Sequence, residues 1–330
     1  MHRLLLACLA SLALYAALFG CVLDRPLAYG FLSAQLDAKL ARAAAIAGPK
    51  LVILAGSNGP YSHRCAVIAP IIGRPCVNGG VAVGIGLDYL FARWEPELAP
   101  GDIVYLPMEE AQYVRPRSAE EVGPDAAIMF RHDWRTLARL APGRWLGAFF
   151  AFDLRYAVMA AIEQSLVASG FHDPRAAAEG GMNEWGDHVG HTAALGAASQ
   201  AVLARADPVH PSAVQVIEGD GAAEIASFLR WAGAHGVRAI GGWPTHFADS
   251  PIPPGTQAAI RDLYLENGAA FLDVSAAYPR TAFFDTPDHL NEEWQIVHSR
   301  RVAQALAAAW HPLRPLRAER VGVRWGPGPD

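Results

Sequence analysis

The sequence predicts an α/β fold in which helices flank both faces of a doubly wound parallel sheet. Short apolar runs, of the kind that form buried parallel strands, alternate with segments of helical period, and the connections between them are short. Hydrophobic residues make up 52% of the 330-residue chain and charged residues only 18%. Such a chain can bury a sizeable core, so global disorder is excluded.

The N-terminal segment is apolar. Residues 4–23 carry no charge, and Arg3 precedes them. Twenty such residues match the thickness of a bilayer core, and the arginine favours the cytoplasm for that end. We therefore expect residues 1–24 to be a signal-anchor helix, or else a signal peptide, with a buried N-terminal helix as the third alternative. Either membrane alternative makes the rest of the chain periplasmic or otherwise extracytoplasmic, anchored in the inner membrane if the helix is retained.

The chain after this segment divides into three predicted parts. A linking helix at 25–47 ends at Gly48-Pro49, an α/β domain covers 48–312, and a C-terminal tail follows at 313–330. In the first third of the domain, the predicted elements are a strand at 50–56, a short helix at 64–73, a short strand at 76–78, an amphipathic helix at 87–98 and a strand at 102–108.

A turn with polar residues follows each of these three strands. Ligands on doubly wound sheets bind at the carboxyl ends of the strands. We therefore expect Ser57, the segment from Asn78 to Gly80, and Glu109 at the ligand-binding edge.

A mid-chain insertion at about 115–215 interrupts the alternation. Its apolar stretch at 145–168 predicts a helix packed on the domain or on a membrane surface. Its polar, glycine-rich loop at 181–192 should cover one edge of the site. The alternation then resumes with a helix at 222–236, a strand from 237, a helix at 254–268, a strand at 269–275 and a C-terminal helix after the N-cap residue Asn291.

Ser57 is the first candidate for chemistry. A serine beside glycines after a buried strand is compatible with an ordinary turn, a phosphate cradle or a nucleophile. Near the other end of the chain, Asp285 and His289 share one loop. A histidine can take the serine proton, and a carboxylate can orient the imidazole. Asp288 is the alternative acid, but adjacent side chains rarely meet productively, so we prefer Asp285.

Three motifs resemble the SGNH (GDSL-like) hydrolase superfamily: GSN at 56–58, VNGG at 77–80 and FFDTPDHLNEEW at 283–294. The resemblance is to its membrane-anchored envelope branch, the DltD-like and alginate O-acetylation-like proteins. It implies a three-layer, flavodoxin-like fold. It also implies a catalytic triad of nucleophile, base and orienting acid, which are Ser57, His289 and Asp285 here.

The same resemblance implies an oxyanion hole formed by the backbone N–H groups of Ser57 and of Gly79 or Gly80. Each donor of this type contributes about 3–4 kcal/mol toward the transition state. Three departures are visible. The family motif around the nucleophile, its first conserved sequence block, reads Ala55-Gly56-Ser57 here rather than Gly-Asp-Ser. The acid lies four residues before the histidine rather than three. The third-block asparagine is absent, with Glu109 at that strand end, so Asn58 or Asn78 is the candidate replacement donor.

By this resemblance, we expect an O-acetyltransferase or esterase that acts on a cell-envelope or extracellular polysaccharide, with a membrane-bound acyl donor protein as partner. A non-catalytic, membrane-anchored scaffold of a polysaccharide export complex and a lipase-like esterase are the alternatives. Candidate substrate-binding residues are Glu109, Trp185, Trp243 and His246, although tryptophan is equally common in cores.

Other partners are not expected. Net charge is −5, and no basic stripe suggests nucleic acid. The glycine-rich run at 79–86 lacks dinucleotide-binding spacing, and His188 and His191 lack a third ligand, so we expect neither cofactor nor metal. Cys65 and Cys76 can form a disulfide in an oxidising compartment, and two buried thiols are equally compatible.

Overall fold

The structure is a computed structural model that describes residues 2–22, 27–151 and 181–309, together with 158, 161–162, 165–166 and 168–170. The predicted tail at 313–330 and much of the apolar stretch at 145–168 lie outside the described residues.

Five parallel strands form the central sheet. They are β1 (Leu51–Ile53), β2 (Cys76–Asn78), β3 (Ile103–Leu106), β4 (Arg238–Gly242) and β6 (Ala270–Leu272), in the order β2-β1-β3-β4-β6. Val52 of β1 lies between Val77 and Val104 on its two neighbours. The strand order reverses between β1 and β3, since β2 lies on one side of β1 and β3 and the later strands on the other. The predicted α/β fold with a parallel sheet flanked by helices is confirmed.

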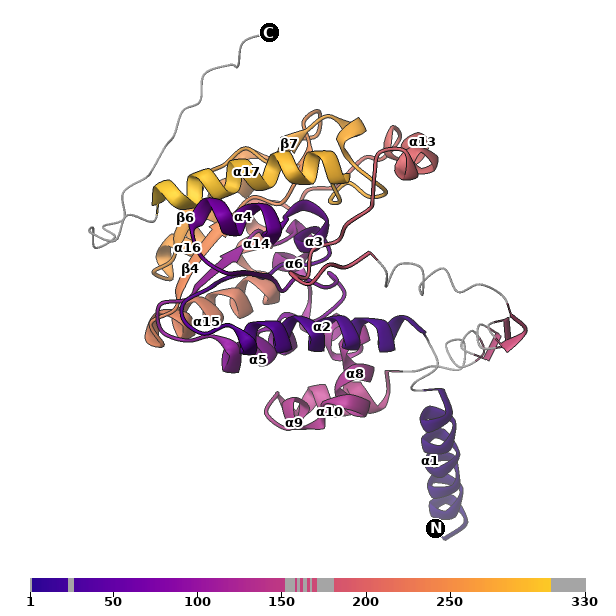
Figure 1. The fold of residues 1–330 in the computed structure, drawn as a ribbon. Coiled ribbons are helices and arrows are strands. Elements are labelled where there is room, and N and C mark those ends of the chain that lie inside the picture. The colour runs from indigo at the N-terminus through magenta and orange to yellow at the C-terminus, as the bar shows by residue number, and fades with distance from the viewer. Residues whose placement is uncertain are drawn as a thin grey trace.

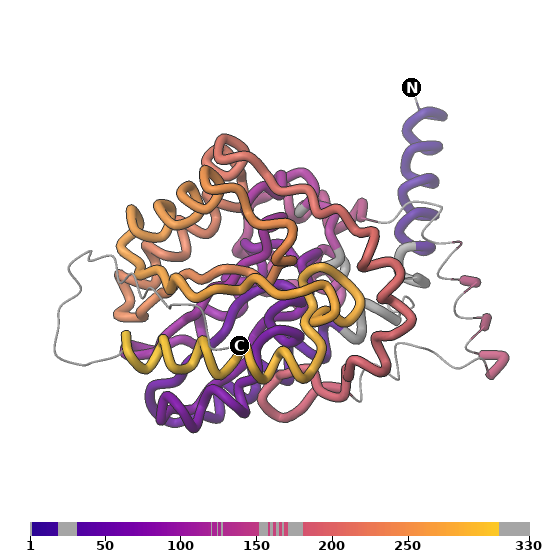
Figure 2. Tube along the Cα trace, turned by 90° about the horizontal axis from the view of Figure 1, so that it is seen from above, coloured from indigo at the N-terminus to yellow at the C-terminus, as the bar shows by residue number. Residues whose placement is uncertain are grey.

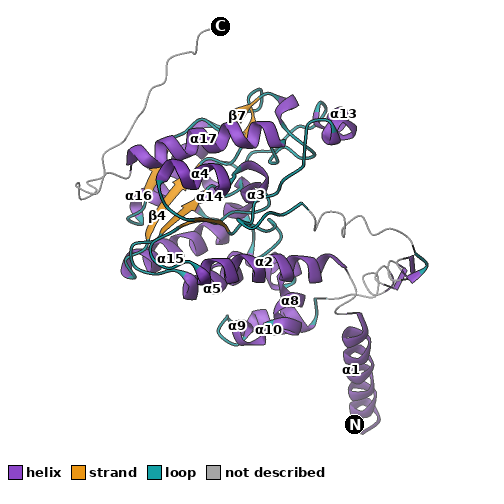
Figure 3. Ribbon diagram, viewed as in Figure 1, coloured by secondary structure: helices purple, strands orange, loops and turns teal. Residues whose placement is uncertain are grey.

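Side chains of the strands alternate between two cores, as a period of two requires. Leu51 and Ile53 pack against α4 (Cys65–Ile72) and α17 (Glu292–Ala309), while Val52 faces the opposite core. That opposite core is covered by α2 (Leu27–Ala45), α5 (Leu87–Trp94), α15 (Asp220–Ala234) and α16 (Pro254–Glu266). Figures 1 and 3 show the strands between these two helical layers, and Figure 2 shows α17 beside the segment that contains α4.

The connection from β3 to β4 includes the predicted insertion. Its helices are α6 (Glu110–Val114), α7 (Arg117–Glu121), α8 (Pro124–His132), α9 (Trp134–Leu137), α10 (Pro142–Phe149), η2 (Leu195–Ser199), α13 (Gln200–Leu203), α14 (Ala213–Ile217) and α15. Three short helices lie elsewhere in the described chain: α3 (Asn58–Ser62), η1 (Glu95–Glu97) and η3 (Arg280–Ala282). A separate parallel pair joins β5 (His246–Phe247) to β7 (Ala277–Tyr278).

The N-terminal segment departs from expectation. Residues His2–Val22 form a helix, α1. However, in the part of the chain that the structure describes, no helix combines the length and the hydropathy that a membrane crossing needs. The expected N-terminal membrane helix is therefore not found there. The next helix, α2, does more than link, because Leu36 and Ala43 are almost wholly buried against the sheet.

Two cross-links fix the segments around β1. At its start, buried Lys50 donates to Asp102 through its Nζ (2.7 Å) and its backbone N–H (2.9 Å). A disulfide joins Cys65, at the start of α4, to Cys76, at the start of β2, with the two Cα atoms 5.3 Å apart. Both cross-links stabilise the frame that carries the turn after β1.

Candidate active site

Ser57 lies in the turn between β1 and α3. The Gly59 N–H donates to the Gly56 carbonyl (3.2 Å) and the Tyr61 N–H to the Ser57 carbonyl (3.2 Å), so the turn closes directly into the helix. The strand order reverses between β1 and β3, and such a switch point opens a crevice at the carboxyl ends of the strands. Ser57 after β1 and Glu109 after β3 both lie at this position.

His289 and Asp285 come from a tight loop before α17. The loop is closed by a hydrogen bond from the Phe284 N–H to the His289 carbonyl (2.8 Å). His289 Nε2 lies 2.8 Å from Ser57 Oγ, and His289 Nδ1 lies 2.7 Å from Asp285 Oδ1. With the proton on Nδ1, His289 donates to Asp285 and accepts from the Ser57 hydroxyl. The structure thus brings the three predicted triad residues together in the order that proton transfer needs.

Asp285, rather than Asp288, is the residue whose carboxylate meets the histidine. The backbone carbonyl of Asp288 instead accepts from the hydroxyls of Ser62 (2.9 Å) and Thr245 (2.8 Å). These two hydrogen bonds attach the histidine loop to α3 and to the segment after β4. They keep the loop at its distance from Ser57.

The His289 ring stacks on Tyr61, which the sequence analysis missed. The two ring centroids are 4.1 Å apart with an interplanar angle of 9°. His188 also stacks on Tyr61, at 4.2 Å and 21°, and its Nδ1 lies 3.2 Å from that of His191. Burial lowers the pKa of His188 and of His191 to about 4, so both are neutral near pH 7. The position of Tyr61, four residues after Ser57 in a helical turn, was the available signal.

Two backbone donors remain available beside Ser57. Among the described residues, the N–H groups of Ser57 and Gly80 donate to no protein acceptor, whereas the Gly79 N–H is bound to the Ile53 carbonyl at 2.8 Å. Gly80 lies against the nucleophile turn, since a Cβ on it would be 2.7 Å from the Gly56 carbonyl oxygen. Of the two glycines predicted for the oxyanion hole, the geometry therefore supports Gly80 and not Gly79.

Neither asparagine replaces the missing amide donor. Asn58 and Asn78 are fully buried. The Asn58 Nδ2 donates to the Pro107 carbonyl (2.7 Å), and the Asn78 Nδ2 donates to the carbonyls of Gly59 (3.0 Å) and His63 (2.9 Å). Both amide groups donate to backbone carbonyls around the turn after β1, so the expectation that one of them donates to the oxyanion is not supported.

The buried side chain of Glu109 packs against the same turn. Its Oε1 accepts the Asn58 N–H at 3.1 Å, and its own N–H donates to Gln112 Oε1 at 3.0 Å, completing a capping box for α6. Burial, followed by the nearby charge of Asp288, raises the pKa of Glu109 to about 7. Glu109 therefore belongs to the site, as predicted by its position, but it contacts the nucleophile turn rather than an open substrate pocket.

The three other predicted substrate-binding residues lie elsewhere. Trp185 packs beside the α4 and α17 core, with the Arg42 guanidinium 4.2 Å from its ring centroid. Trp243 is 6% exposed and donates its indole N–H to Asp273 (2.7 Å), and His246 is in β5. In the described chain, none of them makes a hydrogen bond or ring contact with the triad.

Two further residues near the site were missed. Lys39 of α2 is buried and donates from Nζ to the Gly80 carbonyl; burial, opposed by the charge of Asp187, lowers its pKa to about 7. Asp187 accepts the backbone N–H groups of Cys65 (2.8 Å) and Ala66 (3.2 Å) at the start of α4. A single lysine in an alanine-rich helix gives no sequence signal for such a contact.

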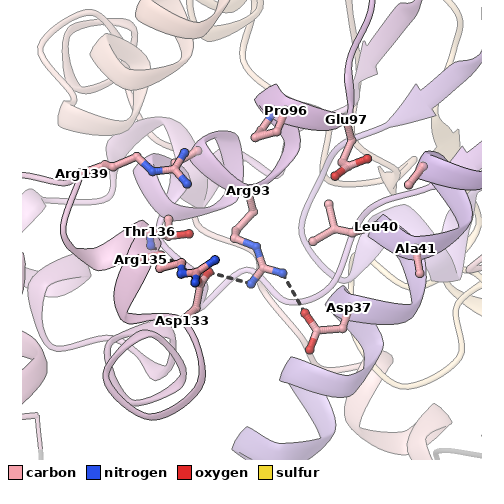
Figure 4. Close-up of a pocket in the computed structure, with 12 residues that line it drawn as sticks. Asp37, Leu40, Ala41, Arg93, Pro96, Glu97, Asp133, Arg135, Thr136 and Arg139 are labelled. Atoms are coloured by element: carbon pink, nitrogen blue, oxygen red, sulfur yellow. Dashed lines mark hydrogen bonds and ion pairs between the residues drawn. The ribbon is translucent and has the colours of Figure 1, made fainter.

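Metal ligands do not gather in the described parts of the chain, where no cluster of three or more histidine, cysteine, aspartate or glutamate residues is placed to hold an ion. A cavity of about 290 Å³ lies away from the triad, between α2, α5 and α9 (Figure 4). Arg93 crosses it and pairs with Asp37 (2.7 Å) and Asp133 (2.8 Å). These pairs tie the three helices together.

The site is thus defined by its own geometry: a hydrogen-bonded serine, histidine and aspartate at a switch point of the sheet, with two backbone donors beside the serine. Comparisons of the chain with protein-family models, with characterised proteins and with solved structures found no match.

Proposed function

We propose that the protein is a serine-dependent enzyme of acyl-ester chemistry, an O-acyltransferase or esterase of SGNH type. The observation that carries the proposal is the continuous hydrogen-bonded line from Ser57 Oγ through His289 to Asp285, with both distances below 3 Å. A general base must lie within hydrogen-bond reach of the proton that it takes, whereas a non-catalytic scaffold has no such requirement.

The residues divide the chemistry as follows. Ser57 Oγ attacks the acyl carbonyl carbon while His289 Nε2 takes the serine proton. The oxygen that gains negative charge is held by the N–H groups of Ser57 and Gly80. His289 then gives the proton to the leaving alkoxide, so that an acyl-Ser57 ester remains. A sugar hydroxyl or water, deprotonated by His289, attacks that ester and restores Ser57.

The proposed substrate is an acylated or acceptor polysaccharide of the cell envelope, with a membrane-bound protein as the acyl donor for transfer. Its support is the resemblance of the motifs around Ser57, Gly80 and His289 to the envelope branch of the superfamily. The Cys65–Cys76 disulfide supports an extracytoplasmic location, because disulfides persist in oxidising compartments.

A fluorophosphonate probe tests the activation of Ser57 without knowledge of the substrate. We expect the intact protein to form one adduct, which peptide mapping places on Ser57. Ser57→Ala and His289→Ala should abolish labelling, whereas Ser118→Ala, which removes an exposed hydroxyl on α7, should not. Absence of labelling in the folded wild-type protein would overturn the proposal.

The scaffold alternative has one observation in its favour, which is the missing amide donor at the end of β3. It predicts polysaccharide binding by the wild type and Ser57→Ala alike, without labelling or ester hydrolysis. For the lipase alternative, an apolar surface beside Ser57 would be needed. The described part of the apolar stretch lines its own hollow with Val158, Ile162 and Leu166, and no triad residue joins it.

A further inference from the structure

Glu109 is an unpaired carboxyl buried beside the nucleophile. Its side chain lies under Gly56, where even a Cβ would come within 2.5 Å of Oε1, and the residue is 6% exposed. Oε1 accepts the Asn58 N–H, and the hydroxyl of the adjacent Ser57 lowers the pKa of the carboxyl. Within the described residues, no lysine or arginine makes an ion pair with it.

Burial disfavours a negative charge on Glu109, and the carboxyl of Asp288, in the loop before α17, adds to that effect. The Asn58 N–H, His289 and the Ser57 hydroxyl favour the charge, but they offset burial and Asp288 only in part. Neighbouring Glu110 turns away to His210 Nδ1 (2.9 Å). A buried carboxyl without a cation lowers its free energy by keeping its proton, and here the pKa lies near 7.

We propose that Glu109 is a positioning residue that holds Ser57 for reaction while it is a neutral carboxylic acid, and that its ionisation turns Ser57 away from His289. The proposal rests on the proposed function of the triad. It gives a role to the residue at the end of β3, where the family pattern has an asparagine that donates to the oxyanion instead.

The reason lies in the single proton of the Ser57 hydroxyl. A neutral Glu109 is a weak acceptor, so that proton points to His289 Nε2, where it must go. An ionised Glu109 is a stronger acceptor and draws the proton toward itself, away from the base. Its charge also repels the oxyanion that forms beside Ser57. Reactivity should therefore fall as pH rises through the titration of Glu109.

The experiment measures the rate of fluorophosphonate labelling from about pH 5 to about pH 9. We expect the labelling rate of the wild type to fall on the alkaline side, by roughly tenfold per pH unit above the pKa of Glu109. Glu109→Gln keeps an acceptor for the Asn58 N–H but cannot ionise, so its labelling should stay high on the alkaline side. Glu110→Gln, which changes the adjacent carboxyl, is the matched control and should keep the alkaline fall. An alkaline fall that persists in Glu109→Gln, or a Glu109→Gln variant inactive at every pH, would overturn the proposal.

A second measurement does not depend on Ser57 reactivity. Infrared difference spectra between acidic and alkaline pH should contain a protonated-carboxyl band that titrates near pH 7 in the wild type and in Ser57→Ala, and that is missing in Glu109→Gln. Without that band the inference about Glu109 fails even if Ser57 is labelled. With the band but without labelling, the proposed enzymatic function fails and the neutral carboxyl stands.

Discussion

Gly80→Ala tests how closely the two loops of the site must approach. The new Cβ would lie 2.7 Å from the Gly56 carbonyl oxygen, 2.9 Å from Pro60 Cδ and 3.0 Å from Gly59 Cα. Ordinary contact begins at 3.4 Å, so the shortest of these falls short by roughly 0.7 Å. The φ angle of Gly80 is not positive, so the effect comes from contact alone.

The magnitude follows from which atoms would have to move. Two of the three are backbone and the third belongs to a proline ring, so no side chain can rotate away and the Gly80 loop must withdraw. Overpacking of this kind costs about 1–3 kcal/mol of stability. If the Gly80 N–H leaves the oxyanion position, the rate should fall by about 10²–10³-fold.

The assay compares labelling rates and hydrolysis of a simple acetate ester at equal concentrations of folded protein, with stability measured by urea unfolding. Gly233→Ala is the control, because a Cβ at that position in α15 meets nothing within 4 Å. It should stabilise the helix by about 0.5–1 kcal/mol and leave labelling unchanged. A folded Gly80→Ala variant that is labelled at the wild-type rate would refute the assignment of Gly80 to the oxyanion hole.

Three other perturbations have defined outcomes. Asp285→Asn should reduce labelling on the order of 10⁴-fold by removing the group that fixes the imidazole tautomer. Burial raises the pKa of Asp285, but the hydrogen bond and the charge of His289 outweigh burial, so the net effect is a lowered pKa. The interaction of Asp285 with His289 therefore stabilises the fold above about pH 4, and this stabilisation is lost as pH falls. The urea midpoints of the wild type and Asp285→Asn should converge in acid. Reduction of the Cys65–Cys76 disulfide should lower the free energy of unfolding by about 2–3 kcal/mol, and a double Cys→Ala variant should show no further response to reductant. Asp102→Asn should lower the free energy of unfolding by about 3–5 kcal/mol, because it leaves the buried ammonium of Lys50 without its partner. The folded fraction should still be labelled at the normal rate, because this ion pair lies at the end of the strands opposite Ser57. Equal stability of variant and wild type would contradict that account.

The fold could be predicted because its strands are short apolar runs buried on both faces. The segments at 51–53 and 103–106 carry that pattern without interruption, and their positions fix the polar turns that follow them. The triad was predictable for a related reason: Asp285 and His289 share one loop, so a local motif already contained half of the geometry.

The surroundings of the triad could not be predicted from sequence. Lys39 reaches Gly80 only through the packing of separate elements, which leaves no periodic or local signal. For Tyr61, the four-residue spacing from Ser57 indicates that it is near the serine, but not that it stacks on His289. Asn58 was expected to face the reacting group. Its side chain instead donates to the Pro107 carbonyl, because consecutive residues of a helical turn face different sides and Asn58 lies on the buried one. Trp185 and Trp243 pack in or beside the cores, the common fate of large aromatic side chains.

Ser57 and His289 are 232 residues apart in the chain, and the loop that carries the histidine is attached by hydroxyls from two other elements. Without that attachment, Ser57 has no base beside it, even where its own turn is formed. In the proposed enzyme, reactivity of Ser57 therefore requires the C-terminal loop to be docked. The proposal thus predicts that a serine-directed probe captures only the molecules in which this loop is in place, so the labelled fraction reports how many those are.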